Sequence, residues 1–571
     1  MDLQPLVDQV KKAFTKTPTP PGLRTPPKLS GGLPVVGHTA DFVRDTIGLL
    51  TRVQRELGNV GAFDVLGKKM VAVFGHEAHE AVFRAPDEQL NPSEAYKIMT
   101  PVFGKGMVYD APPEKMNEQF KMLLPALKDK RMRTYGEIVV SEVEQSIANW
   151  GDSGEIDLVD YCRVLTNFTS SHCLLGREFR TGMTDEFARV YHSLERGVTP
   201  IAYLNAHLPI PSFRARDKAR IRLEEMVTKI IQERRASGRE GEDFLQTMMD
   251  ARYKHGAPLT EYEITGMLIA AMFAGHHTSS VTTAWALIEL VRNPDLLARV
   301  REELETTFGT GEEVGFASLR NVPLTEATVL ETLRLHPPLF MLVRVAEKDF
   351  VYKDFFIEKG SWVITSPTVS HLMAEEFPEP KKFDLDRYLP PREEDKKVDF
   401  AYIPFGGGRH KCMGNAFAIL QVKAILTILL RRFDFELVNK NVGSNFHGLV
   451  VGPEEPVKLK YKRRASAADL AAQNIAAQEI ASQAAAKAAR TNGAHASSDA
   501  TLKKFKVTVD LDLCQGHAAC QGESPEIFRQ IGVGKVRLLQ ARPDPSLRAK
   551  AESAARYCPS HAIRVEDDTA S

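Results

Sequence analysis

The residues with the clearest capacity for chemistry lie in a glycine-rich loop, PFGGGRHKCMG, at positions 404–414. Cys412 stands just before an apolar, helix-forming stretch, residues 415–430. A thiolate at a helix N-terminus is stabilised by the helix dipole and by unpaired N–H groups. The three glycines would allow the backbone to approach a flat ligand closely. A buried free cysteine beside a flexible loop is the simpler alternative, but the pattern favours a thiolate presented to a flat molecule.

A second group of possible metal ligands lies near the C-terminus, as Cys514-x-x-His517-x-x-Cys520 and Cys558 followed by Pro559. In a reducing compartment such a cluster indicates metal binding rather than disulfides. The spacing resembles that of bacterial ferredoxins, which bind iron–sulfur clusters. A four-iron cluster needs a cysteine where His517 stands. This departure resembles small three-iron ferredoxins, and the resemblance implies a 3Fe-4S cluster held by Cys514, Cys520 and Cys558.

Two other metal sites remain open for these residues. His517 could be an unusual fourth ligand of a 4Fe-4S cluster, or the three cysteines and His517 could bind zinc tetrahedrally. The Cys-Pro pair at Cys558 argues against zinc.

The glycine-rich loop itself matches a known signature, Phe-x-x-Gly-x-His-x-Cys-x-Gly, at Phe405, Gly408, His410, Cys412 and Gly414. It therefore resembles the haem-binding loop of the cytochromes P-450. The resemblance implies that Cys412 is the axial ligand of haem b. It also implies a haem-thiolate monooxygenase, because a cysteinate ligand favours cleavage of the O–O bond.

Two further segments agree with this family. Glu331 and Arg334 stand one helical turn apart. A surface ion pair is the simpler explanation, but Arg387 in FDLDRY supplies the third member that the family's buried structural network has. Ala274 to Thr278 (AGHHT) resembles the family's oxygen-binding groove, in which Thr278 would hydrogen-bond dioxygen. A hydroxyl bonded back to its own helix is the alternative role for Thr278.

The resemblance covers residues 30–461 and implies a mainly α fold with small β-sheets. Most members of the family carry an acid where this chain has His277. That departure, the segment YKIMTPVFGKGMVYD (96–110) and the segment LPIPSFRARDKAR (208–220) resemble the sterol 14α-demethylase branch. This branch removes the 14α-methyl group of a sterol such as lanosterol as formate, in three successive oxygen-dependent oxidations. Dioxygen and a sterol are therefore the implied substrates, and azole-type inhibitors the implied ligands.

Site residues follow from that resemblance position by position. The sterol would be lined by Tyr96, Phe103, Phe273, Ala274, His277, Leu339 and Met341. The haem propionates would be bound by Tyr96, Tyr109, Lys121, Arg344 and His410, with Phe120 in an alternative register of the Lys121 position. Core packing is the alternative for the aromatic residues. His277 could be a satisfied helix histidine, but we hypothesise that it joins a proton route, since imidazole transfers protons near neutral pH.

The elements that hold these residues form two units. Residues 1–461 are the expected monooxygenase domain, with short strands near residues 71 and 361. Residues 462–501 form an Ala-rich linker whose larger apolar residues make no single stripe. Residues 502–571 are expected to form a small α+β ferredoxin-like domain, opened by a strand at 505–510.

Composition limits the function classes. Lys plus Arg and Asp plus Glu are 74 each among 571 residues, so nothing global favours nucleic acid. No apolar run is long enough to span a bilayer. A cytoplasmic enzyme is expected, with peripheral membrane contact left open by the amphipathic N-terminal stretch.

The source of electrons can also be inferred. The chain contains no Gly-x-Gly-x-x-Gly fingerprint and no room for a flavin domain. A separate NAD(P)H-dependent ferredoxin reductase is therefore the expected partner. Two other functions remain open, namely a hydroxylase of another polycyclic or fatty substrate and a haem and iron–sulfur redox sensor.

Overall fold

The structure is a computed structural model. It describes residues 18–182, 184–199, 202, 205–238, 240–241, 243–309, 313–446, 450–464, 504–511, 513–514, 519–530 and 536–567. The amphipathic N-terminal stretch, nearly all of the Ala-rich linker and His517 lie outside these residues.

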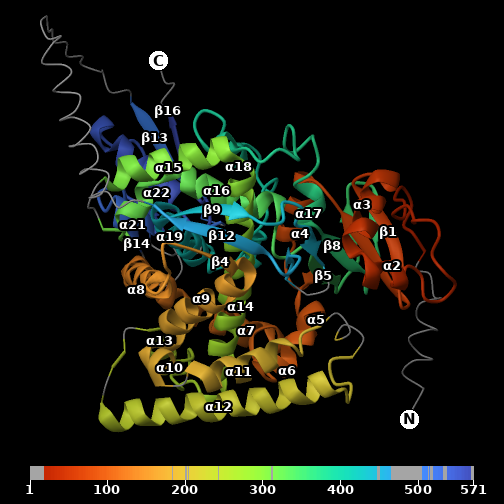
Figure 1. Cartoon of the computed structure of the whole chain (residues 1–571). Helices are drawn as coiled ribbons and strands as arrows, with labels where there is room; N and C mark the ends of the chain where they lie inside the picture. The colour runs from red at the N-terminus through yellow and green to blue at the C-terminus, as the bar shows by residue number, and fades with distance from the viewer. Residues whose placement is uncertain are drawn as a thin grey trace, which may run out of the picture.

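Helices make up most of the first unit, as expected for a mainly α fold (Figure 1). The longer helices are α3 Thr46–Leu57, α4 His76–Arg84, α7 Pro113–Leu123, α8 Asp129–Ile147, α9 Leu158–Ser170, α11 Thr184–Glu195, α12 Pro211–Ser237, α14 Glu261–Arg292, α15 Pro294–Phe308, α16 Pro323–Leu335 and α19 Asn415–Arg432. The shorter ones are α2 Thr39–Arg44, α5 Ser93–Tyr96, α6 Thr100–Phe103, α10 Arg177–Gly182, α13 Phe244–Asp250, α17 Pro367–Ser370 and α18 Glu394–Lys397. The 3-10 helices are η1 Lys97–Met99, η2 Val108–Asp110, η3 Leu124–Leu127, η6 Ser318–Asn321, η7 Leu385–Tyr388 and η8 Gly408–His410. The segment η4 Ser171–Leu175 is a π-helix.

The sheets of this unit are small. Five strands pair in the order β1-β2-β8-β5-β3, in which β2 and β8 are parallel and the other pairs antiparallel. Three more pair as β4-β12-β9, and two hairpins complete the set. The strands are β1 Val60–Val65, β2 Lys68–Val73, β3 Leu90–Asn91, β4 Ser153–Asp157, β5 Leu342–Ala346, β6 Phe350–Tyr352, β7 Phe355–Ile357, β8 Trp362–Thr365, β9 Phe433–Leu437, β10 Ser444–Asn445, β11 Gly452–Pro453 and β12 Lys458–Arg463. The strands expected near residues 71 and 361 are confirmed as β2 and β8.

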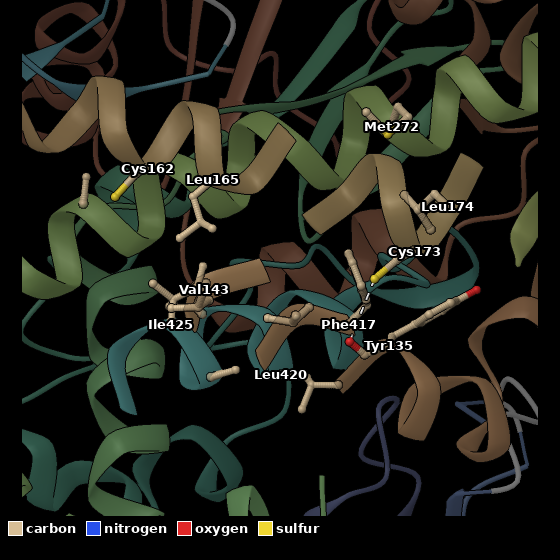
Figure 2. Packing of buried hydrophobic residues seen from close by; sticks show 14 of the residues in the cluster. Tyr135, Val143, Cys162, Leu165, Cys173, Leu174, Met272, Phe417, Leu420 and Ile425 are labelled. Carbon is tan, nitrogen blue, oxygen red and sulfur yellow. Dashed lines mark hydrogen bonds between the residues drawn. The ribbon is translucent and has the colours of Figure 1, made fainter. Parts of the chain in front are cut away.

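Helix α14 runs through the centre of this unit and packs on α9, α16 and α19 (Figure 1). It begins with a capping box, in which the Thr260 hydroxyl accepts from the Glu263 N–H and the Glu263 side chain accepts from the Thr260 N–H. Figure 2 shows the core where α8, α9, α14 and α19 meet, with Tyr135 packed against Phe417 at 5.6 Å between ring centroids. The apolar character all round α14 follows from this position.

The C-terminal unit is the expected small α+β domain. Strand β13 (Phe505–Val509) pairs antiparallel with β16 (Ile563–Asp567), and β14 (Phe528–Gln530) with β15 (Val536–Leu538). It also contains α21 (Ala519–Glu523), η9 (Pro545–Leu547) and α22 (Arg548–Arg556). Phe505, Val507, Ile527 and Phe528 are the larger members of its own buried core. In Figure 1 these elements lie beside α15 and α16, on the opposite side of the molecule from α12.

Within the described ranges, no helix combines the length and the apolar composition needed to cross a membrane.

Candidate active site and metal centres

The Cys412 loop is fixed by a close approach to α4. Gly408 has φ +64°, and a Cβ there would lie 2.0 Å from the carbonyl oxygen of Phe83. The Cys412 N–H donates to the Phe405 carbonyl at 2.9 Å, which closes the loop three residues before α19 begins. Glycine at position 408 is therefore required by both the backbone conformation and the lack of space.

Cys412 has a free thiol on this loop. The residue is exposed, yet the neighbouring protein atoms raise the pKa of the thiol, whereas the Gly414 N–H and the Lys411 ammonium lower it. The donated N–H and the nearby cation are features that stabilise a thiolate once a metal replaces the proton. The chemistry of the loop thus fits an axial thiolate ligand.

The middle of α14 is uncovered although the helix is central. Ala274 is exposed, and Phe273, His277 and Thr278 are half-buried, while the residues of α14 on either side are largely buried. A core helix exposes such side chains only where it borders a space. The groove expected from AGHHT thus has the open surface that a haem and dioxygen would need.

The Thr278 hydroxyl donates to the Ala274 carbonyl at 2.6 Å. This is the back-bonded arrangement given above as the alternative role. A hydroxyl that donates to its own helix still has lone pairs with which it can accept a hydrogen bond. The Thr278 hydroxyl can therefore still accept a hydrogen bond from a donor in the groove.

Two tyrosines and an arginine meet on the side where propionates were expected. Tyr96 and Tyr109 stack at 4.4 Å, and Tyr109 lies 6.2 Å from the His410 ring. Arg344 is buried, with 7% of its surface exposed. Burial raises the pKa of Tyr96, and the charge of Arg344 acts against that rise, so the cation is near the phenol. Neutral phenols and a buried guanidinium suit carboxylate groups.

His410 and Lys121 depart from the simple expectation. His410 Nε2 lies 2.7 Å from Asp87 Oδ1, so one ring nitrogen is engaged by a buried carboxylate. Phe120, the residue in the alternative register, packs 5.6 Å from Tyr109 and 6.5 Å from His410. Lys121 is exposed. The structure therefore brings Phe120, and not Lys121, to this group.

The expected sterol-contacting residues are grouped in part. Phe103 lies edge-on to Phe273 at 6.2 Å, and Phe273 lies 5.9 Å from the His277 ring. Leu339 and Met341 are half-buried and lie directly before β5, which carries Arg344. Aromatic and aliphatic side chains that are only partly covered in this way suit a rigid apolar substrate.

The structure adds an acid to His277. Glu195, at the end of α11, places Oε1 2.8 Å from His277 Nε2 and 3.8 Å from His276 Nε2. His276 Nδ1 lies 3.0 Å from the Thr166 hydroxyl, and burial lowers the pKa of His276 well below its usual value. His276 is therefore neutral near pH 7. His276 is also buried, whereas His277 is half-buried, so His277 is the imidazole beside Glu195 that borders the groove.

Glu331, Arg334 and Arg387 form one buried network. Arg334 donates to the Glu331 carboxylate at 2.7 and 2.8 Å, and Arg387 Nε lies 3.3 Å from Glu331 Oε1. The Tyr388 hydroxyl donates to the same carboxylate at 2.8 Å. The side chains of Glu331 and Arg334 are 0% exposed. This arrangement ties α16 to η7 and excludes the surface ion pair considered above.

The three cysteines of the C-terminal unit share one small region. Cys520 and Cys558 are buried, Cys514 is half-buried, and all three are free thiols. Burial raises the pKa of Cys520 to about 12, and the sulfurs of Cys558 and Cys514 add to that rise. Mutual repulsion of this kind requires the sulfurs to be near one another. Three converging thiols fit the ligand set of an iron–sulfur cluster.

Sequence reasoning missed Glu195 and Asp87 as site residues. Glu195 lies in an ordinary amphipathic helix about eighty residues before His277 and belongs to no motif. Asp87 and Phe120 have no spacing signal either. Only Phe120 had been considered, as a register alternative.

Two family models match the chain. A cytochrome P450 model matches residues 26–461. A model described as a 4Fe-4S single cluster domain matches residues 507–565.

Several curated relatives cover the first unit almost completely. Proteins named sterol 14alpha-demethylase from Mycolicibacterium vanbaalenii and Mycobacterium tuberculosis are 43% identical over 444 residues, which is 77% of this chain and 98% of each relative. The obtusifoliol 14-alpha demethylase of Sorghum bicolor is 39% identical, over 78% of this chain and 92% of the relative.

A solved structure also has this fold. The structure titled "Retinoic acid bound cyanobacterial CYP120A1" matches with a TM-score of 0.70 and 24% identity, over 77% of this chain and all of that one. This likeness concerns the fold.

Proposed function

Because the chain belongs to the cytochrome P450 family, we propose that it is a sterol 14α-demethylase that receives electrons from its own C-terminal iron–sulfur domain. The observation that carries this proposal is the 43% identity to bacterial sterol 14alpha-demethylases over 98% of their length. The lanosterol 14-alpha demethylase of Bos taurus is 36% identical over 90% of its length, so relatives named for this reaction come from bacteria, plants and mammals. His277 and the half-buried Phe103 and Phe273 support the same substrate class.

The family implies a haem, and the residues present fit one. Cys412 would hold the iron, and Arg344 with the neutral Tyr96 and Tyr109 would hold the propionates. A cysteinate-bound haem supplies oxidising chemistry that uses one dioxygen and two electrons in each round. The protein supplies position, protons and exclusion of water.

The proton is assigned to the pair Glu195 and His277. Their 2.8 Å contact would let a proton reside at His277 Nε2 or on the Glu195 carboxyl, so that Glu195 can return a proton to the imidazole after one has been delivered. Thr278, one residue further along α14, would accept a hydrogen bond in the groove and fix its direction. Proton delivery without bulk water would keep the oxidation coupled to the sterol.

The substrate would be a 14α-methyl sterol placed against Tyr96, Phe103, Phe273, Ala274, Leu339 and Met341. A rigid apolar ring system is held by such surfaces through burial of its own area. Three rounds would oxidise the methyl carbon to alcohol, aldehyde and formate and leave a ring double bond. Azole-type inhibitors would compete for the same groove.

The electrons would come from NAD(P)H by way of a separate ferredoxin reductase, and the reaction would take place in the cytoplasm, where NAD(P)H is found. For the cluster itself we favour 3Fe-4S bound by Cys514, Cys520 and Cys558. The matching family model is described as 4Fe-4S, so His517 as a fourth ligand is the alternative. Electron paramagnetic resonance of the oxidised protein separates them, because an oxidised 3Fe-4S cluster has an odd electron count and an oxidised 4Fe-4S cluster of the ferredoxin type does not.

The decisive experiment is product analysis by mass spectrometry. The purified holoprotein is incubated with lanosterol, a generic ferredoxin reductase and NADPH. A 14-demethylated sterol with a new ring double bond, together with formate, is the expected result. Intact lanosterol, with haem and cluster both reducible, would contradict the sterol assignment and favour a hydroxylase of another polycyclic substrate.

A further inference from the structure

The described part of the C-terminal unit touches the first unit next to the Cys412 loop. The Asn415 side chain, three residues after Cys412, donates to the carbonyl oxygen of Pro559. Pro559 directly follows Cys558. Asn415 is 4% exposed and Pro559 is half-buried, so this contact is largely shielded from solvent. One hydrogen bond thus connects the backbone beside the expected cluster ligand with the first residue of α19.

Arg320 of η6 holds the segments that flank two expected cluster ligands. Its guanidinium pairs with Glu523, three residues after Cys520 in α21. The same guanidinium lies 5.1 Å from the centre of the Tyr557 ring, and the Tyr557 hydroxyl donates to the Arg320 carbonyl. Tyr557 directly precedes Cys558. A single side chain of the first unit therefore touches residues beside two of the three cysteines.

The ion pair between Arg320 and Glu523 is largely shielded from solvent. The side chains of Arg320 and Glu523 are 21% and 11% exposed. Arg320 also lies over the ring of Phe316 at 4.6 Å, and the Ser553 hydroxyl donates to Glu523 at 2.6 Å, so both partners are oriented before they meet. A more exposed ion pair, Arg564 with Asp399 at 2.9 Å, lies at the rim. A half-buried and pre-oriented pair contributes more than a rim pair.

The two expected metal ligands lie at one junction. Lys411, the residue before Cys412, lines the same cavity as Cys558.

A cavity of about 420 Å³ lies at the same junction and is lined by both units. A polar interface that leaves a cavity unfilled is typical of units that associate and separate. This suits a carrier domain that must also meet a reductase.

We propose that the C-terminal unit docks on the Cys412 face of its own chain through Arg320, and that Arg320 is the positioning residue for electron transfer from cluster to haem across the Pro559–Asn415 contact. This inference rests on the proposed function for the presence of both cofactors. In each transfer the reduced cluster is oxidised by one electron and the ferric haem iron is reduced to ferrous. The external flavin-containing reductase, which oxidises NAD(P)H, restores the cluster. No sterol has to react for this step to occur.

The test uses the full-length holoprotein with reductase and NADPH under carbon monoxide, which traps ferrous haem and reports its formation rate by absorbance. Arg320→Glu should slow haem reduction by at least about tenfold, because it reverses one member of a half-buried ion pair. The charge-swapped variant Arg320→Glu with Glu523→Arg should recover most of the rate. Arg222→Glu is the matched control. It changes an exposed, ion-paired arginine of α12, opposite the C-terminal unit, and should leave the rate unchanged.

Hydrogen exchange gives a second readout that does not depend on turnover. Amides of residues 557–567 should exchange faster in Arg320→Glu than in the original chain and regain protection in the charge-swapped variant. Haem content, cluster content and sterol affinity should be equal in all variants. The proposal would be overturned if Arg320→Glu reduced its haem as fast as the original chain. It would also be overturned if the rate constant of the original chain rose in proportion to its concentration, because transfer would then occur between chains. Because carbon monoxide trapping needs no sterol product, a failure of this proposal is distinct from a failure of the sterol assignment.

Discussion

At the scale of single residues, the unexpected feature is that the groove histidine has an acid partner. His276 and His277 are adjacent, yet they differ in environment, since His276 is 1% exposed and hydrogen-bonded to Thr166, whereas His277 is half-buried beside the groove. Glu195 lies within 4 Å of both ring nitrogens. The carboxylate can therefore orient His277 and exchange a proton with it, while His276 acts as a fixed neutral neighbour.

This arrangement predicts uncoupling when either member of the pair is changed. Glu195→Gln keeps the shape of the side chain but cannot hold a proton, and His277→Ala removes the imidazole. Either change should lower sterol product formation by roughly a hundredfold, the lower range for loss of a positioned proton donor, while NADPH oxidation continues. The measurement is the ratio of formate formed to NADPH consumed.

The matched control for this pair is Glu186→Gln, an exposed position on the same helix whose carboxylate pairs with Arg222. It should leave the ratio unchanged. Full coupled turnover in His277→Ala would show that this histidine only packs in the helix.

At the scale of elements, the Cys412 loop depends on supports that lie far away in the sequence. Helix α16 is tied to η7 by Glu331, Arg334 and Arg387, and Arg334 also donates to the carbonyl of His371 at 2.9 Å. The His371 ring in turn accepts from the N–H of Ile403 at 3.0 Å, just before the loop. The network therefore connects α16 to the segment that leads to Cys412.

Removing one member of this network should be costly. Arg334→Ala leaves the Glu331 carboxylate, whose side chain is 0% exposed, without its two-point partner. Loss of one partner of a buried pair costs about 3–5 kcal/mol. Chemical denaturation followed by tryptophan fluorescence reports this unit, since Trp150, Trp285 and Trp362 all lie in it. Arg222→Ala, at an exposed pair, should change the unfolding free energy by less than about 1 kcal/mol, and equal effects of the two substitutions would contradict this account.

Acid should weaken the same region through a buried histidine. His79 of α4 is 0% exposed, and its ring nitrogens lie 2.9 Å from the Phe400 carbonyl and 3.0 Å from the Ser370 hydroxyl. Burial, together with a smaller effect of the nearby His76, lowers the pKa of His79 from 6.5 to about 4. The unfolded chain therefore binds a proton below pH 6.5 that the folded protein excludes. Stability is constant above that pH and falls as the pH drops, by about 2 kcal/mol from this residue at pH 5.

The expected measurement is the denaturation free energy between pH 7 and pH 5. The buried His371, with a pKa lowered to about 3 by burial and by the charge of Arg334, and the buried His276, with a pKa lowered well below its usual value, should each add a similar loss in the original chain. His79→Gln should therefore remove roughly a third of the pH dependence, although it is less stable at pH 7. His207→Gln, an exposed position, should keep the original profile. An unchanged profile in His79→Gln would show that other groups dominate acid unfolding.

At the scale of the whole molecule, the sequence predicted the units but not how they meet. The Cys412 loop, the α14 groove and the cysteines of the C-terminal unit are local patterns, so their chemistry was readable from spacing. Arg320, Glu523 and Tyr557 belong to no motif, and their meeting depends on the docking of two separately folded units. Glu195 was missed for the same reason, because an ion pair between two helices leaves no periodic signal. The C-terminal unit has eleven Lys and Arg against nine Asp and Glu from Lys503 onward, a near balance that favours local rather than charge-steered docking.

Residues 465–503, which include all of the predicted linker (462–501) except its first three residues, lie outside the described residues, but the effect of the linker can be predicted from the docked interface. An interface that leaves a cavity unfilled gives weak docking between separate molecules, whereas a tether supplies an effective concentration of about 1 mM. Deleting residues 466–490 leaves 14 linker residues (465 and 491–503), which reach at most about 50 Å and restrict the poses available to the C-terminal unit. Turnover per molecule at nanomolar protein should then fall about tenfold, while sterol affinity, which depends only on the groove, stays the same.

Replacing residues 466–490 with a Gly/Ser segment of equal length is the control and should keep turnover, because it preserves reach rather than sequence. Equal turnover of the shortened and original chains at nanomolar concentration would mean that tethering does not limit electron delivery, and loss of turnover in the Gly/Ser variant would mean that the Ala-rich sequence itself takes part.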